Sequence, residues 1–240
     1  MTRYEAIFRR KSVRKYRDDA VEEHILEKIR GFGKEALGMR PEIRMKWEIY
    51  RASDHKVKGM FQVKAPYYAA LYAEDCEDCQ IQAGCLMEQV VLYLHTQGIG
   101  SCYQGGARLK EEGEAEGMKL MMILAFGCPA EPLERTRTEF KRAEFRKLVK
   151  ANVPPGKAQK KLLESARLAP SSLNQQPWRF VVTENRIHLF TRRPGKMGYQ
   201  RQYGKNMFHI GIVLSHMLLA AEEYWFDLEY RKLDSIMEKA

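Results

Sequence analysis

The residues with the clearest potential for chemistry lie between Pro170 and Asn174. This stretch reads Pro-Ser-Ser-Leu-Asn, and it joins a segment with helical apolar spacing to a run of large apolar residues that begins at Trp178. Ser171, Ser172 and Asn174 have short polar side chains, which favour turns and helix caps. The same groups, held rigid at both ends, could instead bind a small polar ligand. These residues alone leave a helix stop and a ligand-binding loop both open.

A cationic segment near the N-terminus offers a complementary chemistry. It contains Arg10, Lys11, Ser12 and Arg14, directly after a short stretch that we expect to be helical. Cationic side chains neutralise a phosphate, while hydroxyl and backbone N–H groups add short, charge-assisted hydrogen bonds. The segment therefore suits a phosphorylated ligand, and a solvated basic turn is the alternative.

A glycine-rich run at residues 98–106 is the third candidate, and it ends in Tyr103, Gln104, Gly105 and Gly106. Glycine permits positive φ angles and lets backbone N–H groups approach a ligand closely. A helix C-cap followed by a turn would explain Gly98 and Gly100. It explains the final glycine pair less well, so we expect a loop that contacts a ligand.

The order of residues within these three segments resembles the motifs of the FMN-dependent nitroreductase family. Residues 169–178 resemble the family's FMN-binding loop, and residues 10–14 resemble the cationic signature that opens nitroreductases. Residues 98–106 resemble the glycine loop that approaches the flavin ring. Lys11 stands where the family often has Arg or His, which keeps the charge. The resemblance covers nearly the whole chain.

Two further arginines follow an expected strand at 118–127. That strand ends in Gly-Cys-Pro-Ala-Glu-Pro, similar to a family motif. Arg135 and Arg137 stand beyond it, where family members place a second pair of cations near the cofactor phosphate. A charged, solvated linker would account for these two residues as well.

The helices and strands that must position these segments occur in a similar order twice along the chain, in two passes. This order suggests a repeated structural unit, with the second copy offset by roughly 130 residues from the first. The first pass has a helix at 22–30, a loop at 31–41, a strand at 45–51 and an apolar helix at 83–96. The second has a helix at 159–169, a strand at 178–183 and an apolar helix at 208–226. Further strands are predicted at 65–73, 118–127 and 186–191.

The resemblance gives this division a meaning. Nitroreductases are α+β homodimers that bind FMN between subunits; one subunit supplies the cationic and glycine segments, and the other supplies Pro-Ser-Ser-x-Asn. In this chain the cationic and glycine segments lie in residues 1–140, and the Pro-Ser-Ser-x-Asn segment lies in residues 141–240. The chain therefore resembles the small, fused members of the family. We expect an α+β fold of two pseudo-repeated halves, one compact unit with one FMN per chain, as a monomer or a loose homodimer.

The activity implied by the resemblance is that of an FMN-dependent NAD(P)H oxidoreductase. In a ping-pong cycle, NADH or NADPH reduces the flavin at N5, and a nitroaromatic, quinone or related small-molecule acceptor then takes the electrons. Arg10, Lys11 and Ser12 would hold the phosphate and Arg14 would lie near the flavin N1, while Gly105 and Gly106 would steer N5. No side chain is required as a general acid, so none is assigned as catalytic. An FMN-binding protein for flavin storage or sensing is the alternative.

The net charge of +10 raises the question of a nucleic-acid or membrane partner. The positive residues are scattered among acidic ones, and no recognition-helix or zinc-finger pattern is present. No apolar run reaches membrane-spanning length. We therefore expect neither a nucleic-acid nor a membrane partner. A basic nucleic-acid-binding protein is the less favoured alternative for this charge. Five cysteines without a secretory signal fit a reduced, cytoplasmic protein.

Two pairs of residues could suggest metal binding. Cys76 and Cys79 have the spacing of a metal or redox pair, but a zinc site needs four ligands and no second matched pair appears. His209 and His216 are seven residues apart and so share a face of the expected helix. We expect both cysteines in the first turns of a helix, both histidines in the core or at a cap, and no metal site.

Overall fold

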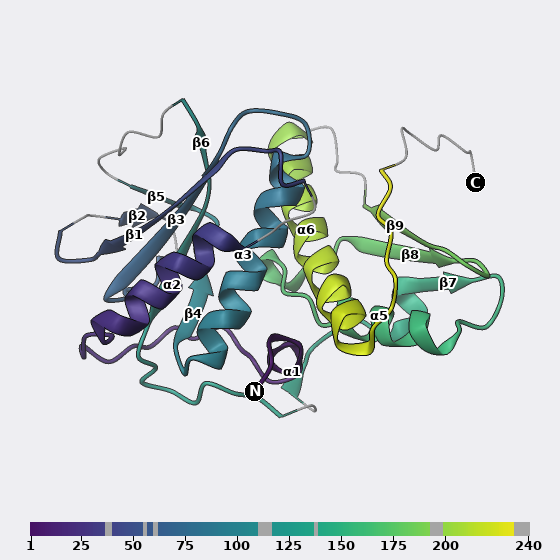
Figure 1. Ribbon diagram of the computed structural model, residues 1–240, viewed down its shortest axis with the longest axis horizontal. Helices are drawn as coiled ribbons and strands as arrows, with labels where there is room; N and C mark the ends of the chain where they lie inside the picture. Colours follow the sequence, from purple (N-terminus) through teal and green to yellow (C-terminus); the bar gives the residue numbers. More distant parts are fainter. Residues whose placement is uncertain are drawn as a thin grey trace.

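The computed structural model describes residues 1–36, 40–54, 57–59, 62–109, 117–136, 139–192 and 199–232, with the backbone alone at 199–201. Two long helices, α3 (Cys79–Thr96) and α6 (Tyr199–Tyr224), pack together at the centre. A four-stranded sheet lies on one side of them and a three-stranded sheet on the other (Figure 1). This arrangement confirms the α+β class.

The four-stranded sheet has antiparallel neighbours throughout, in the order β1-β3-β6-β4. Its strands are β1 (Met45–Arg51), β3 (Tyr67–Ala73), β6 (Lys119–Gly127) and β4 (Gly100–Tyr103). All of β3 is buried because both faces of the sheet are covered. Alternate residues of β3 point to opposite faces. One set packs in the main core with α3 and α2 (Glu23–Glu35), and the other packs in a second cluster with residues of β2 (Val57–Gly59) and β5 (Ala107–Leu109).

The second sheet belongs to the C-terminal part of the chain. Its strand β7 (Val149–Ala151) runs parallel to β8 (Trp178–Val182), and β9 (Ile187–Thr191) pairs with β8 in antiparallel fashion. Trp178, Phe180 and Val182 alternate into the core as period-two side chains do in a strand. The short helix α4 (Phe145–Leu148) precedes this sheet, and α5 (Lys157–Arg167) leads into the short 3₁₀ turn η2 (Ser172–Asn174). Helix α1 (Arg3–Ile7) begins the chain with a capping box between Thr2 and Glu5.

Two glycines allow the central helices to approach at backbone distance. A Cβ at Gly84 of α3 would lie 2.0 Å from the carbonyl oxygen of Phe208, and one at Gly211 of α6 would lie 2.0 Å from that of Ile81. Only glycine fits at either position, because any side chain would push the two backbones apart.

Within the described residues, no helix is both long and apolar enough to span a lipid bilayer.

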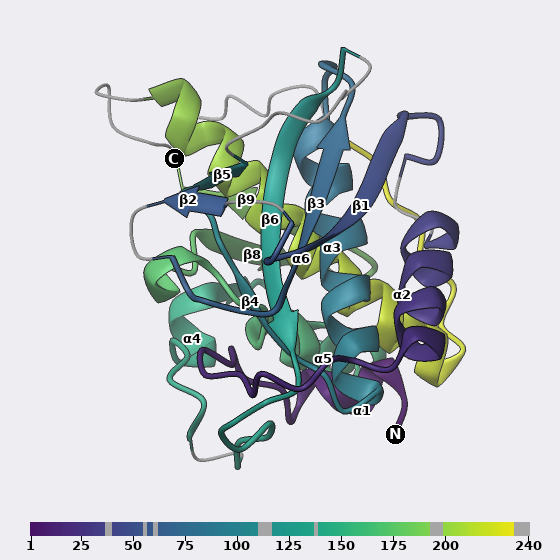
Figure 2. The ribbon, with the colours of Figure 1, turned by 90° about the vertical axis from the view of Figure 1, so that its left-hand side faces the viewer.

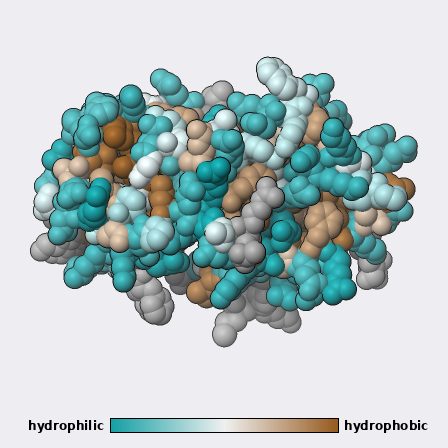
Figure 3. Space-filling model, turned by 90° about the horizontal axis from the view of Figure 1, so that it is seen from below, coloured by the Kyte–Doolittle hydropathy of each residue, from teal (hydrophilic) through white to brown (hydrophobic). Residues whose placement is uncertain are grey.

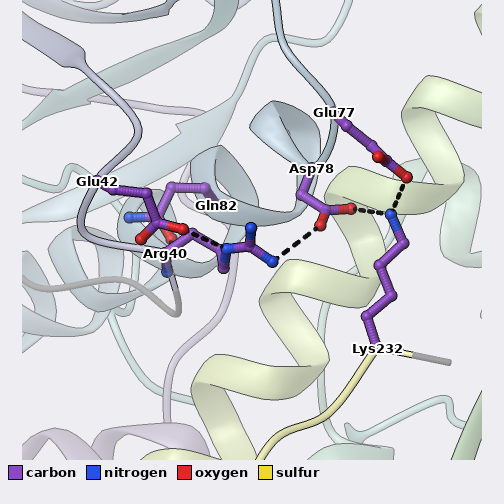
Figure 4. A network of polar contacts seen from close by, with 6 residues as sticks. All are labelled: Arg40, Glu42, Glu77, Asp78, Gln82 and Lys232. Atoms are coloured by element: carbon purple, nitrogen blue, oxygen red, sulfur yellow. Dashed lines mark hydrogen bonds and ion pairs between the residues drawn. The ribbon is translucent and has the colours of Figure 1, made fainter.

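A chain of ion pairs ties the segment after α6 to the start of α3 (Figure 4). Lys232 pairs with Glu77 and, at 2.8 Å, with Asp78. Asp78 also contacts Arg40 at 3.4 Å, and the backbone N–H of Arg40 donates to Gln82 at 2.8 Å. The residue that precedes α3, Asp78, has a left-handed φ of 67°. These contacts bring three segments that are distant in sequence to one end of the central helix.

The surface seen from below is mostly hydrophilic, with separate hydrophobic areas between the polar residues (Figure 3). This distribution agrees with the scattered charges of the sequence.

Several predicted boundaries are wrong, each for a structural reason. The loop expected from Gly31 is helical up to Glu35, because Gly33 lies against β1 and a Cβ there would meet Trp47 Nε1 at 2.5 Å. This glycine serves helix–strand packing and does not end the helix. Residues 100–103, expected in a loop, form β4 through pairing with the end of β6. Helix α6 begins at Tyr199, earlier than the apolar pattern indicated, because its first turns are polar.

The two passes predicted from the sequence have the same order of element types. Helix α2, the antiparallel pair β1 and β3, and the long helix α3 recur as α5, β8, β9 and α6. Whether the halves are true repeats stays a prediction, as do their limits at 1–140 and 141–240.

Candidate functional site

The cationic segment is fastened between β4 and the loop that follows β6. Val13 donates its N–H to the carbonyl of Ser101 at 3.0 Å, and Arg10 forms a backbone bridge with Glu134. The N–H of Arg14 donates to the carboxylate of Glu131 at 2.6 Å. Figure 2 shows this segment after α1 crossing the base of the sheet below β4 and β6. The segment predicted to hold a phosphate is therefore fixed in place along its backbone.

Arg10 is the buried member of this segment. Its side chain is only 4% exposed, and its Nη2 has no hydrogen-bond partner among the described residues. A guanidinium so placed is costly, because a buried charge needs a partner to replace water. Arg10 therefore has an unused donor that an anionic ligand would satisfy.

Two further arginines come close to Arg10. The guanidinium of Arg135 lies 4.5 Å from the ring of Phe140, and that of Arg142 lies 5.9 Å from the same ring. Arg135 Nε also donates to the carbonyl of Arg10 at 3.0 Å. Burial, together with the positive charge of Arg10, lowers the pKa of Arg135 to about 10. Burial and the charges of Arg135 and Arg10 lower the pKa of Arg142 to about 10 as well.

Arg135 and Arg142 remain charged at neutral pH because their pKa values of about 10 lie well above 7. Together with Arg10 they form a cluster of three guanidinium groups. They repel one another, and an anion bound among them would relieve both the repulsion and the unpaired donor of Arg10. The donor set fits a phosphate group, for which guanidinium geometry is well suited.

Arg142 also holds the loop from Pro170 to Asn174. Its Nη1 donates to Asn174 Oδ1 at 3.0 Å, and its Nε and Nη2 donate to the carbonyl of Leu168 at 3.3 and 3.0 Å. Asn174 Nδ2 in turn donates to the carbonyl of Lys141 at 2.7 Å. Arg142 itself belongs to the second half, and its neighbours Arg10 and Arg135 belong to the first, so Arg142 brings the polar loop close to those two cations.

Within this loop, several polar groups serve the loop's own conformation. Ser171 Oγ accepts a hydrogen bond from the N–H of Gln176 at 2.9 Å. Leu173, Asn174 and Gln176 have left-handed φ angles of 51°, 54° and 47°. Such angles are unfavourable for residues with side chains and persist only where the surroundings enforce them. The turn-forming role weighed from the sequence is therefore present for Ser171 and Asn174.

His209 supports the same loop from α6. The N–H of Ser172 donates to His209 Nε2 at 3.1 Å, so the ring is neutral and its proton lies on Nδ1. Burial, helped by the charge of Lys205, lowers the pKa of His209 to about 4. The histidine is only 6% exposed, which agrees with the predicted core position.

The glycine-rich turn is built on the side chain of Gln104. Its Oε1 accepts from the N–H of Val63 at 2.9 Å, and its Nε2 donates to the carbonyls of Cys102 and Tyr103 at 3.2 Å each. The side chain of Gln104 therefore holds the turn in shape. A Cβ at Gly105 would meet nothing within 4 Å, so this side of the turn is open.

The remaining predicted residues are distributed around this site. Arg14 is exposed, and its guanidinium donates to the carbonyl of Ser12 at 3.3 Å. Lys11, Ser12 and Pro170 are partly buried, and Gly106 is exposed. Arg137 lies outside the described residues. Arg142 was missed, although its place in a basic stretch beside Phe140 and close to Arg135 was a usable signal.

Comparison with known proteins shows the family to which the chain belongs. The family model described as "Putative TM nitroreductase" matches residues 2–221. The chain belongs to this nitroreductase family. It superimposes on a crystal structure of "a putative nitroreductase" from Thermotoga maritima with a TM-score of 0.67 and 26% identity, over 94% of this chain and 86% of the other.

Two other relatives match less completely. A nitroreductase family protein from Clostridium difficile 630 has a TM-score of 0.52 at 16% identity, over 64% of this chain and 100% of that one, and shows the fold alone. A Staphylococcus haemolyticus protein named "Putative NAD(P)H nitroreductase" is 38% identical over 63 residues, which is 26% of this chain and 29% of that protein. The chain thus matches under a third of the length of this curated relative.

Proposed function

We propose that this protein is an FMN-dependent NAD(P)H oxidoreductase of nitroreductase type, with a nitroaromatic, quinone or related small molecule as electron acceptor. The observation that carries the proposal is the buried Nη2 of Arg10, which has no hydrogen-bond partner in the described part of the chain, close to Arg135 and Arg142. Family membership supports a flavin as the phosphorylated ligand, and the cluster fits the FMN phosphate.

When bound, the flavin supplies hydride transfer at N5 between NADH or NADPH and the acceptor. Arg10 and Arg135 would hold the phosphate charge, together with Lys11 and Ser12, and Arg137 is proposed from the sequence alone. Arg14 would stabilise negative charge near the flavin N1. The backbone N–H groups at Gly105 and Gly106 would orient N5, with Tyr103 and Gln104 shaping that turn.

The loop from Pro170 to Asn174 would close the site from the second half. Arg142 holds this loop and lies close to Arg10 and Arg135 of the first half, which supports a single site made by residues of both halves. We therefore propose one FMN per chain, a monomer or loose homodimer, and a cytoplasmic location without nucleic-acid or membrane partners.

The test is an FMN titration of the purified protein, followed by its visible spectrum. We expect about one FMN per chain, and we expect Arg10→Ala/Ser12→Ala to weaken binding at least tenfold, since each charged hydrogen bond contributes about 1.5–3 kcal/mol. Arg146→Ala is the matched control, because Arg146 is exposed and its side chain pairs only with Glu144 among the described residues. A wild-type protein that does not bind FMN would refute the proposal.

A second assay separates an enzyme from a flavin-storage or flavin-sensing protein. The FMN-loaded protein should oxidise NADH or NADPH with a nitroaromatic or quinone faster than free FMN at the same concentration. Bound flavin with no faster turnover would favour the storage or sensing role.

A further inference from the structure

Glu88 and His216, which the proposed site does not include, form a chain of hydrogen bonds through the contact between α3 and α6. Tyr103 Oη donates to Glu88 Oε2 at 2.6 Å, and Glu88 Oε1 lies 3.0 Å from His216 Nε2. His216 Nδ1 lies 2.9 Å from the carbonyl oxygen of Ser165. Glu88 and His216 are 0% and 1% exposed, so water does not compete for these bonds.

The partners determine where the protons lie. A carbonyl oxygen can only accept, so His216 Nδ1 carries a proton towards Ser165. A second proton lies between His216 Nε2 and Glu88. Burial opposes ionisation of Glu88, but the hydrogen bond from His216 and the charge of Arg10 outweigh it and lower the pKa of the carboxyl. Both ring nitrogens and both carboxylate oxygens are thus hydrogen-bonded, as buried polar groups require.

The two ends of this chain lead to the two loops of the proposed site. Tyr103 is the last residue of β4 and precedes the glycine-rich turn. Ser165 lies in the last turn of α5, which continues into the loop that begins at Pro170. Glu88 belongs to the first half, and His216 belongs to the second. The bonds therefore connect the two loops through the core.

We propose that Glu88 and His216 are positioning residues, which hold the glycine-rich turn and the Pro170–Asn174 loop in fixed relation so that both face one ligand. The inference rests on the proposed function, because it assigns one flavin to these two loops. A preorganised pair of loops binds more tightly, since ordering them costs no free energy at the moment of binding. Hydrogen bonds in a low-dielectric interior are strong enough to impose such an arrangement.

The chain offers matched variants for a test. In His216→Phe a ring remains but both hydrogen bonds are lost, and Tyr103→Phe removes the bond at the other end. In Glu88→Gln the amide oxygen can accept from Tyr103 and the amide N–H can donate to His216 Nε2, so the geometry survives without the carboxylate charge. Ser215→Ala is the control, because the buried Ser215 hydroxyl has no partner among the described residues. Val213→Ala, also buried on α6, controls for lost stability.

The experiment measures the FMN Kd of each variant by quenching of flavin fluorescence, with urea unfolding in parallel. We expect His216→Phe and Tyr103→Phe each to raise the Kd about tenfold, a size common for coupling between distant positions. The double variant should bind no more weakly than either single one, because each break interrupts the same chain of bonds. Glu88→Gln should stay within about threefold of the wild type and Ser215→Ala should equal it.

The outcomes separate the two proposals. A His216→Phe variant that is less stable but keeps the wild-type Kd, as we expect of Val213→Ala, would reduce the pair to a structural role. Multiplying effects in the double variant would also overturn the positioning role. If His216→Phe does not fold, the FMN Kd of Tyr103→Phe is compared with that of Glu88→Gln, because only Tyr103→Phe breaks the chain of hydrogen bonds. Equal Kd values for these two variants would overturn the positioning role. A wild-type protein without FMN affinity would remove the proposed function and this inference together.

Discussion

Two glycines on α6 should respond to alanine in opposite directions. At Gly211, a Cβ would lie 2.0 Å from the carbonyl oxygen of Ile81 and 2.7 Å from the N–H nitrogen of Cys85. At Gly204, the nearest atoms to a Cβ are side-chain carbons of Gln80 at 3.8 and 3.9 Å, which is ordinary contact. Both residues lie within one helix, so the helical preference of alanine over glycine applies to both.

The expected free energies follow from these distances. Alanine stabilises a helix interior by about 1 kcal/mol relative to glycine, and Gly204→Ala should gain roughly 0.5–1 kcal/mol. At Gly211 the opposing atoms belong to the backbone of α3, so α6 must move by roughly 1 Å or more to reach normal separation. A gap of that size forfeits about a quarter to a half of each dispersion contact nearby. Overpacking costs about 1–3 kcal/mol or more, so Gly211→Ala should lose about 2 kcal/mol net.

Thermal unfolding followed by far-UV circular dichroism measures both variants. For a chain of this size, about 1 kcal/mol corresponds to roughly 2–4 °C, so Tm should fall by about 4–8 °C in Gly211→Ala and rise by a few degrees in Gly204→Ala. The FMN Kd should also rise in Gly211→Ala alone, because separating α3 from α6 lengthens the contact between Glu88 and His216. A Gly211→Ala variant as stable as Gly204→Ala would refute the close helix contact.

Three further predictions concern single side chains. Arg142→Met should lower the free energy of unfolding by about 1–3 kcal/mol and weaken FMN binding, since it removes the hydrogen bond that holds Asn174. Urea unfolding and flavin titration measure the two effects. An FMN affinity equal to that of the wild type would contradict the prediction. His209 has a folded pKa of about 4 against an ordinary value of 6.5, so the unfolded state binds the extra proton. Its stabilising contribution is complete above pH 6.5 and is lost as pH falls through about 4, by on the order of 3 kcal/mol. The variant His209→Gln, which can still accept from Ser172, should flatten this part of the stability–pH curve, and an unchanged curve would refute the assignment. Lys232→Met should change the free energy of unfolding by less than about 1 kcal/mol in urea, because the ion pairs of Lys232 are near the surface. A larger loss would show that the segment after α6 stabilises the fold more strongly.

The sequence predicted most elements because their local patterns agree with their final surroundings. Strand β8 alternates Trp178, Phe180 and Val182, and helix α3 is apolar over most of its length. Such periodicities depend only on the backbone geometry of a strand or helix. The family motifs likewise predicted three of the segments that the fold brings towards one region. Glycine was less reliable: the glycine-containing stretch 31–41 was predicted as a loop, but Gly33 lies inside helix α2 and contacts Trp47.

Contacts between distant segments were decided only by the tertiary structure. Nothing local in the sequence pairs Glu88 with His216, or places Arg142 beside Asn174, because these residues are far apart in the chain and meet through packing. The roles of Ser171 and Asn174 within their own loop also depend on the surrounding backbone. The sequence by itself determined the element types, the charge of the phosphate segment and the family resemblance, since each follows from residue type and spacing. The tertiary structure decided which charges lie unpaired and which helices touch, because burial and proximity are properties of the folded chain.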